Sequence, residues 1–267
     1  MFYRLSFFLL VVESISCVSL VGRQIPTTTQ PTVQRDQQAL AILSQALSAA
    51  GGQTAVAAIH DYAATGKVTY SWGDGVQGSV TVKGRGLHQF RVDATFADGV
   101  HSWVLNSVTT FQRNPDGSTS PLPSQNTIKP ATVIFPLLQI LTVSQDTSFS
   151  ISYGGLVTRN GQQLYDILVQ KIFPAASDPI GALSKMTKSQ IFIDPKTLTV
   201  QIIEDTAYRK DGGPGEYLHD ILFLNYQTVN GILVPFSITE SIAGQQTMTM
   251  QLSQIKFNTG LTDTDFE

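Results

Sequence analysis

Apolar residues recur at helical spacing in residues 36–50. Alanine and leucine at positions 39, 43, 46, 47 and 50 would form one stripe, while glutamine and serine fill the opposite side. Asp36 is suited to cap the first turn, and Gly51 and Gly52 follow as a stop signal. The pattern predicts an amphipathic helix over residues 36–50, and a second, short helix over residues 54–59.

From residue 66 onward the hydrophobic period changes to two. This alternation, broken by short turns, predicts five strands of an antiparallel meander, at 67–72, 79–82, 90–96, 100–105 and 108–113. Asn-Gly pairs at 160–161 and 230–231 are strong hairpin signals in the second half. Seven more strands are predicted there, at 149–158, 164–172, 190–194, 198–205, 217–226, 232–240 and 246–257.

Two segments carry more apolar residues than one buried face requires. Residues 131–143 are apolar on nearly every side, which predicts a helix buried all round or covering an apolar hollow, with Pro136 beginning a new helical piece. The segment before it, 117–130, is predicted to be a surface loop. Strand 217–226 places leucines on one face, and Ile221 and Phe223 on the other. Such strands predict helices on one side and a second sheet or a hollow on the other.

The first 35 residues differ from the rest of the chain. Residues 1–21 combine Arg4, a short apolar run and a small-residue exit, which predicts a secretory signal. Cys17 lies where a lipoprotein's acylated cysteine would lie; the alternative is an incidental cysteine in a removed signal. Residues 22–35 are rich in Thr, Pro and Gln, which predicts a linker before one domain at 36–267. We expect export to the periplasm, free or tethered to the membrane through Cys17.

Composition narrows the possible partners. Charged residues make up 14% of the 267 residues, and the formal net charge is −3. Few Lys and Arg side chains are available to neutralise phosphates, so nucleic acid is not expected as a partner. A single cysteine excludes an internal disulfide and a thiolate metal cluster.

The sequence carries no recognisable catalytic or cofactor motif. The four histidines are far apart with no zinc-binding spacing, and Gly84-Arg85-Gly86 is predicted to be a turn rather than a nucleotide loop. Glu204 and Asp205 would face opposite sides of a strand. We therefore predict neither metal nor cofactor, and no enzymatic activity. An enzyme would need His88, His101 or His219 beside a carboxylate in a cleft.

The end of the chain carries the most specific pattern. Residues 226–238 read YQTVNGILVPFSI, and residues 255–266 read IKFNTGLTDTDF. Together they resemble the closing hairpin and final strand of the outer-membrane lipoprotein carrier and sorting superfamily, which includes LolA-, LolB- and RseB-like periplasmic proteins. The resemblance implies an α+β fold, in which a strongly curved antiparallel sheet forms a half-barrel. An N-terminal helix and a helical insertion would cover its concave face.

In that superfamily the concave face shelters acyl chains. The resemblance thus implies a non-enzymatic protein that binds a lipid or lipoprotein acyl chains in an apolar cavity. The alternatives are a core filled by side chains, and an RseB-like regulatory module that contacts an envelope protein without bound lipid. Side-chain type and strand phase select the candidate lining residues, Trp72, Phe90, Phe96, Trp103, Phe135, Leu138 and Phe223.

Overall fold

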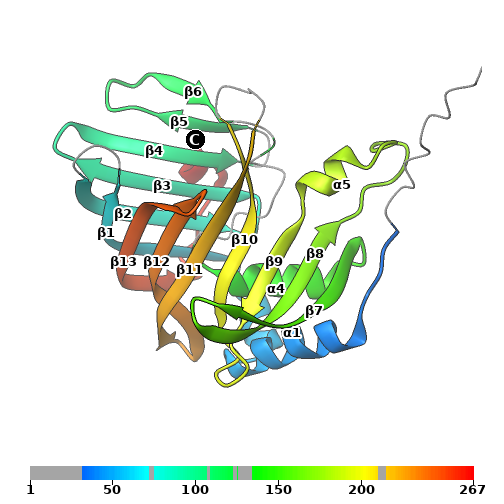
Figure 1. The fold of residues 1–267 in the computed structure, drawn as a ribbon. Helices are drawn as coiled ribbons and strands as arrows, with labels where there is room; N and C mark the ends of the chain where they lie inside the picture. The colour runs from blue at the N-terminus through cyan, green and yellow to red at the C-terminus, as the bar shows by residue number, and fades with distance from the viewer. Residues whose placement is uncertain (1–31, 72–74, 107–108, 123–124, 126–133, 210–214) are drawn as a thin grey trace, which may run out of the picture.

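The computed structural model describes residues 32–71, 75–106, 109–122, 125, 134–209 and 215–267. They form one antiparallel sheet of 13 strands with the longer helices on one side (Figure 1). The strands are β1 (Asp61–Tyr70), β2 (Val76–Arg85), β3 (Gln89–Phe96), β4 (Gly99–Asn106), β5 (Thr110–Arg113), β6 (Thr119–Pro121), β7 (Phe149–Arg159), β8 (Gln162–Lys171), β9 (Ser189–Ile193), β10 (Val200–Tyr208), β11 (Glu216–Val229), β12 (Ile232–Ile242) and β13 (Gln245–Phe257). The helices are α1 (Gln37–Ala49), α2 (Gln53–Ala57), α4 (Pro136–Gln145), α5 (Ala182–Met186) and the 3₁₀ helix η1 (Asp263–Phe266).

The sheet consists of two meanders that meet in its middle. Its order is β6-β5-β4-β3-β2-β1-β13-β12-β11-β10-β9-β8-β7, so the first and last strands pair with each other. The chain runs outward from β1 to the edge strand β6 and crosses the molecule through α4. It restarts at the opposite edge, β7, and returns to the centre. Because β6 and β7 do not pair with each other, the sheet is a half-barrel with open edges, and the predicted fold class is confirmed (Figure 1).

Helix α1 forms as its periodicity predicts. The Asp36 carboxylate accepts hydrogen bonds from the backbone N–H groups of Gln38 and Ala39, at 2.8 and 3.0 Å, and caps the first turn. The apolar stripe is buried against the sheet and α4. Helix α4 begins at Pro136, where the missing N–H group of proline costs nothing. Residues 131–133 of the predicted helix lie outside the described residues.

Several predicted boundaries are wrong. Strand β1 begins at Asp61, not at residue 67, because Tyr62, Ala64, Gly66 and Val68 already alternate inward. The predicted loop after residue 117 contains the short strand β6. Helix α5 is not predicted, since its five residues are too few to show a period.

Strand β11 is apolar on both faces, but only one face is fully covered. Ile221 and Phe223 are buried on the helix side, whereas Leu218 and Leu224 on the outer side are 49% and 45% exposed. The prediction of an apolar layer on the second side is therefore wrong at these two leucines, whereas Leu222 between them packs against a small second core of Leu164, Phe192 and Ile202. Between the two exposed leucines, the tip of the β7–β8 hairpin folds over the outer face, where Arg159 contacts Glu204 at 2.6 Å and packs over the ring of Phe192.

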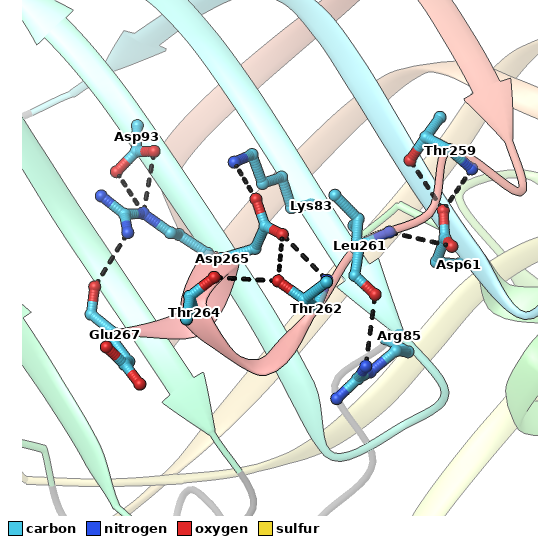
Figure 2. A network of polar contacts seen from close by, with 11 residues as sticks. Asp61, Lys83, Arg85, Asp93, Thr259, Leu261, Thr262, Thr264, Asp265 and Glu267 are labelled. Carbon is cyan, nitrogen blue, oxygen red and sulfur yellow. Dashed lines mark hydrogen bonds and ion pairs between the residues drawn. The ribbon is translucent and has the colours of Figure 1, made fainter.

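The last ten residues cross the outer face of β1–β4 and end beside β3 and β4 (Figure 2). The Asp61 carboxylate accepts four hydrogen bonds from Thr259, Gly260 and Leu261, which turn the chain after β13. Beyond this turn, Lys83, Arg85 and Arg91 bind Asp265, Asp263 and the backbone carbonyl of Glu267. The ring of Phe266 is fully buried there. This segment therefore lies on the outer face and does not cover the concave face.

Candidate functional site

The concave face of the sheet is a continuous apolar surface. Strand register places Phe223, Ile238, Met250 and Val68 in one row across β11, β12, β13 and β1, and all four are buried. The row continues through Gly78 to Phe96, since a Cβ atom at Gly78 would lie 2.7 Å from the Phe96 ring. Two predicted lining residues, Phe223 and Phe96, thus lie at opposite ends of one row.

A second row crosses the same face nearer the start of β1. It joins Phe90, Gly84, Tyr62 and Phe257 across β3, β2, β1 and β13. A Cβ atom at Gly84 would lie 2.2 Å from Cζ of Tyr62, so the phenol ring occupies the space above the glycine. Phe90, another predicted lining residue, is buried at the end of this row.

Helix α4 covers the second row. Phe135, the residue before the helix, lies edge-on to the Tyr62 ring at 5.7 Å and stacks on the Phe257 ring at 5.5 Å. Leu138, one turn later, is also buried in the common core. The insertion therefore brings Phe135 and Leu138 to the same apolar layer as the strand residues.

Aromatic side chains gather at the far end of the face. Trp103 lies 5.3 Å from Tyr70 and 6.4 Å from the His101 ring, and Phe96 packs edge-on to both Tyr70 and His101. Trp103 and His101 are only half-buried, so this end of the face is the more open one. Trp72 and Cys17 lie outside the described residues.

A charged network interrupts the apolar face on neighbouring strands β10, β11 and β12. His219 bonds Asp205 through Nδ1 and Glu240 through Nε2, both at 3.0 Å, and the Thr247 hydroxyl donates to Glu240 at 2.9 Å. Burial alone would lower the pKa of His219, but the two carboxylates outweigh it and raise this pKa to about 9. Burial would raise the pKa of Glu240, yet the His219 cation holds it below its usual value.

This network limits what the face can do chemically. At neutral pH His219 is a cation with both ring nitrogens bonded to carboxylates, so neither nitrogen can accept a proton from a substrate. Glu204 and Asp205 point to opposite faces, as predicted. Within the described residues, no group of three or more His, Cys, Asp or Glu side chains could hold a metal ion.

The described side chains of the concave face and of α1 and α4 are buried together in one common core. The small cavity where α4 ends beside Phe149 and Lys171 has a volume of about 60 Å³, too little for an acyl chain. A larger cleft of about 340 Å³ lies instead on the outer face across β7–β11, beside the exposed Leu168 and Leu218. Among the described helices, none is long and apolar enough to cross a membrane.

Known structures share this architecture. A domain from Vibrio parahaemolyticus, described as an outer membrane lipoprotein-sorting protein, aligns with a TM-score of 0.51 and 13% identity, over 86% of this chain and 96% of that chain. A LolA superfamily protein from Nitrosomonas europaea aligns with a TM-score of 0.53 and 13% identity, over 86% and 97%. The chain has the LolA-superfamily fold. No family model and no curated protein matches the sequence.

The LolA-type fold confirms the predicted architecture. The sequence did not, however, reveal several residues of the concave face. Tyr62, Gly84 and Phe257 form the second row, but Ala63, Ala64 and Gly66 have low strand propensity and hide the period of β1. The partners of His219 come from two other strands, so only knowledge of the strand pairing could have joined them.

Proposed function

We propose that this chain is an exported, non-enzymatic protein that binds a lipophilic ligand, a lipid or lipoprotein acyl chains, between the concave face and its helices. One observation carries the proposal. A helix buried on seven of its ten residues lies over a wide apolar face in a sheet with two unpaired edges. Because the two edge strands do not pair with each other, the half-barrel can widen without breaking hydrogen bonds between strands.

The energetics support binding without a polar motif. Each buried methylene group contributes about 0.8 kcal/mol, so a dozen sheltered carbons contribute ~10 kcal/mol before the costs of binding. The names of the two similar structures, lipoprotein sorting and the LolA superfamily, agree with this chemistry. The signal predicted at residues 1–21 supports an exported location, and the occupied nitrogens of His219 support a binding role rather than catalysis.

Organic-solvent extraction tests the proposal. The protein purified from its native envelope should release acyl-containing molecules that mass spectrometry detects in stoichiometric amount. Adding methyl palmitate to the extracted protein should then raise its melting temperature, because a ligand that binds only the folded state stabilises it. Clean extracts together with an unchanged melting temperature would remove lipid binding from consideration.

The outer cleft favours a second candidate. Leu168 and Leu218 are 40% and 49% exposed beside the 340 Å³ cleft, and exposed apolar groups of this kind mark protein interaction sites. An envelope-facing regulatory module with no bound lipid would use this surface. Substitution of both leucines by serine should abolish capture of such a partner while leaving solvent-extractable lipid unchanged.

A further inference from the structure

Exposed leucines gather on the outer face of the second meander. Leu218 and Leu224 lie there on β11, as described above, and Leu168 lies there on β8, because its neighbours Ile167 and Val169 are buried in the common core on the opposite side. Strands β8 to β11 are consecutive neighbours in the sheet, so these side chains belong to one surface (Figure 1). Exposed apolar groups that share one face are typical of a surface that a partner covers.

Two of these leucines line the cleft of about 340 Å³. The strand register places Ser152, Leu168, Gln190 and Glu204 in one row across β7, β8, β9 and β10, and all four line the cleft together with Leu218. Ligand sites begin at about 300 Å³. A cleft of this size is too small for a folded domain but admits a few side chains of an extended segment.

The same row ends in carboxyl groups that outnumber the cation bound to them. Asp220 follows Glu204 in the register, and the Arg159 guanidinium contacts these two carboxylates at 3.3 and 2.6 Å. Asp166 accepts hydrogen bonds from the Gln190 amide at 3.0 and 3.2 Å. Burial and the negative charge of Glu204 raise the pKa of both Asp166 and Asp220, although Arg159 acts in the opposite direction. Three carboxyl groups thus interact with one guanidinium, and a second cation would be attracted to them.

We propose that the cleft between Leu168 and Leu218 binds an extended segment of a partner protein in which a large apolar side chain is followed by a lysine or an arginine. The apolar side chain packs on the two leucines, and the cation binds beside Glu204 and Asp220. This inference rests on the second candidate function, the regulatory module, and specifies the chemistry of its partner. It does not depend on lipid binding at the concave face.

Fluorescence anisotropy of labelled hexapeptides, titrated with the full chain, measures this preference. The peptide LKTLKT should bind about tenfold more tightly than LETLET, which reverses the charges, and about tenfold more tightly than SKTSKT, which removes the apolar side chains. In about 1 M salt the difference between LKTLKT and LETLET should nearly vanish, because charges are then screened beyond ~3 Å.

Variants locate the two contacts. Leu218→Ser should weaken LKTLKT about fivefold, because the segment covers the exposed half of this leucine. The matched control is Leu224→Ser, a similarly exposed leucine of the same strand that is not part of the cleft, and it should bind like the wild type. Asp220→Asn should weaken LKTLKT about threefold. Lys188, an exposed residue that lines the cleft, carries the same sign as the partner's cation, so Lys188→Glu should strengthen LKTLKT about fivefold.

The outcomes separate this inference from the function on which it rests. If LKTLKT and LETLET bind equally well and Leu218→Ser weakens both, the cleft has no preference for a cation; the inference then fails and the second candidate function stands. If none of the three peptides binds the wild type, or if Leu224→Ser weakens binding as much as Leu218→Ser, the docking surface itself is wrong and both fail. Lipid release on solvent extraction is independent of all these results.

Discussion

Gly84 shows how one residue decides the shape of the concave face. Its missing side chain leaves the space that the Tyr62 phenol fills. The sequence predicts a turn at Gly84-Arg85-Gly86, and this prediction is wrong for the first two residues, which end β2; only Gly86, with a φ of 59°, lies in the turn. Local glycine content could not reveal this, because the neighbour that requires Gly84 lies on another strand.

Gly84→Ala should therefore destabilise the protein. The added methyl group would lie 2.2 Å from Cζ of Tyr62, and this ring is buried under Phe135. Overpacking of this kind costs about 1–3 kcal/mol, which urea denaturation would measure. Gly86→Ala is the contrasting variant, since nothing lies within 4 Å of its Cβ position and only backbone strain opposes it. A Gly84→Ala protein as stable as the wild type would contradict the packing described for Tyr62.

His219 predicts a dependence of stability on pH. The folded protein keeps the proton of His219 up to about pH 9, whereas an unfolded histidine releases it near pH 6.5. The stabilisation is complete below pH 6.5 and is lost as the pH rises through 9, a difference on the order of 3 kcal/mol. Denaturant titrations at pH 6.5 and 9.5 should show this loss in the wild type and not in His219→Gln. If the free energy of unfolding changes equally between pH 6.5 and 9.5 in the wild type and in His219→Gln, the imidazole is not charged in the folded protein.

At the scale of elements, the sequence predicts the existence of a helix or strand more reliably than the residues at which it ends. Helix α1 agrees with its prediction to within one residue at each end because Asp36 and Gly51 mark its limits. Helix α4 continues two residues past the predicted end at 143, and its C-terminus depends on Arg35, 108 residues away from Val143. Distant side chains of this kind set boundaries that no local pattern contains.

Arg35→Ala should loosen the C-terminal end of α4. Four backbone carbonyls lose their donor, and hydrogen bonds to a charged group contribute about 1.5–3 kcal/mol. Hydrogen exchange should become faster in residues 143–149 and stay unchanged in α1, whose cap is Asp36. Unchanged exchange in residues 143–149 would show that the helix end is held by packing alone.

Asp61→Ala should release the C-terminal segment from the outer face. The carboxylate accepts four hydrogen bonds from the turn at residues 259–261, and these overcome the effect of burial and lower its pKa. We expect a loss of about 2–3 kcal/mol and faster cleavage near residue 260 in limited proteolysis. Asp116→Ala, at an exposed turn, is the control and should behave like the wild type. Resistance of the Asp61 variant to cleavage would show that Phe266 and the ion pairs beyond the turn are sufficient to anchor the segment.

At the scale of the whole molecule, the run of short turns predicts two meanders but not how they join. Every neighbouring pair of strands follows the order of the sequence, with one exception, the pairing of β1 with β13. Nothing in residues 61–70 or 245–257 indicates a partner almost 200 residues away. The concave face depends on this pairing, because it joins Val68 to Met250 and Tyr62 to Phe257. The candidate residues could therefore be chosen by side-chain type, but their arrangement on the face could not be predicted from the sequence.

The pairing of β1 with β13 also affects the order in which the protein can fold. The two strands lie almost 200 residues apart in the sequence, so the two meanders cannot join until both strands have been synthesised, and contacts so distant in sequence form slowly. The strand pairing that closes the middle of the sheet is thus expected to be a late step of folding.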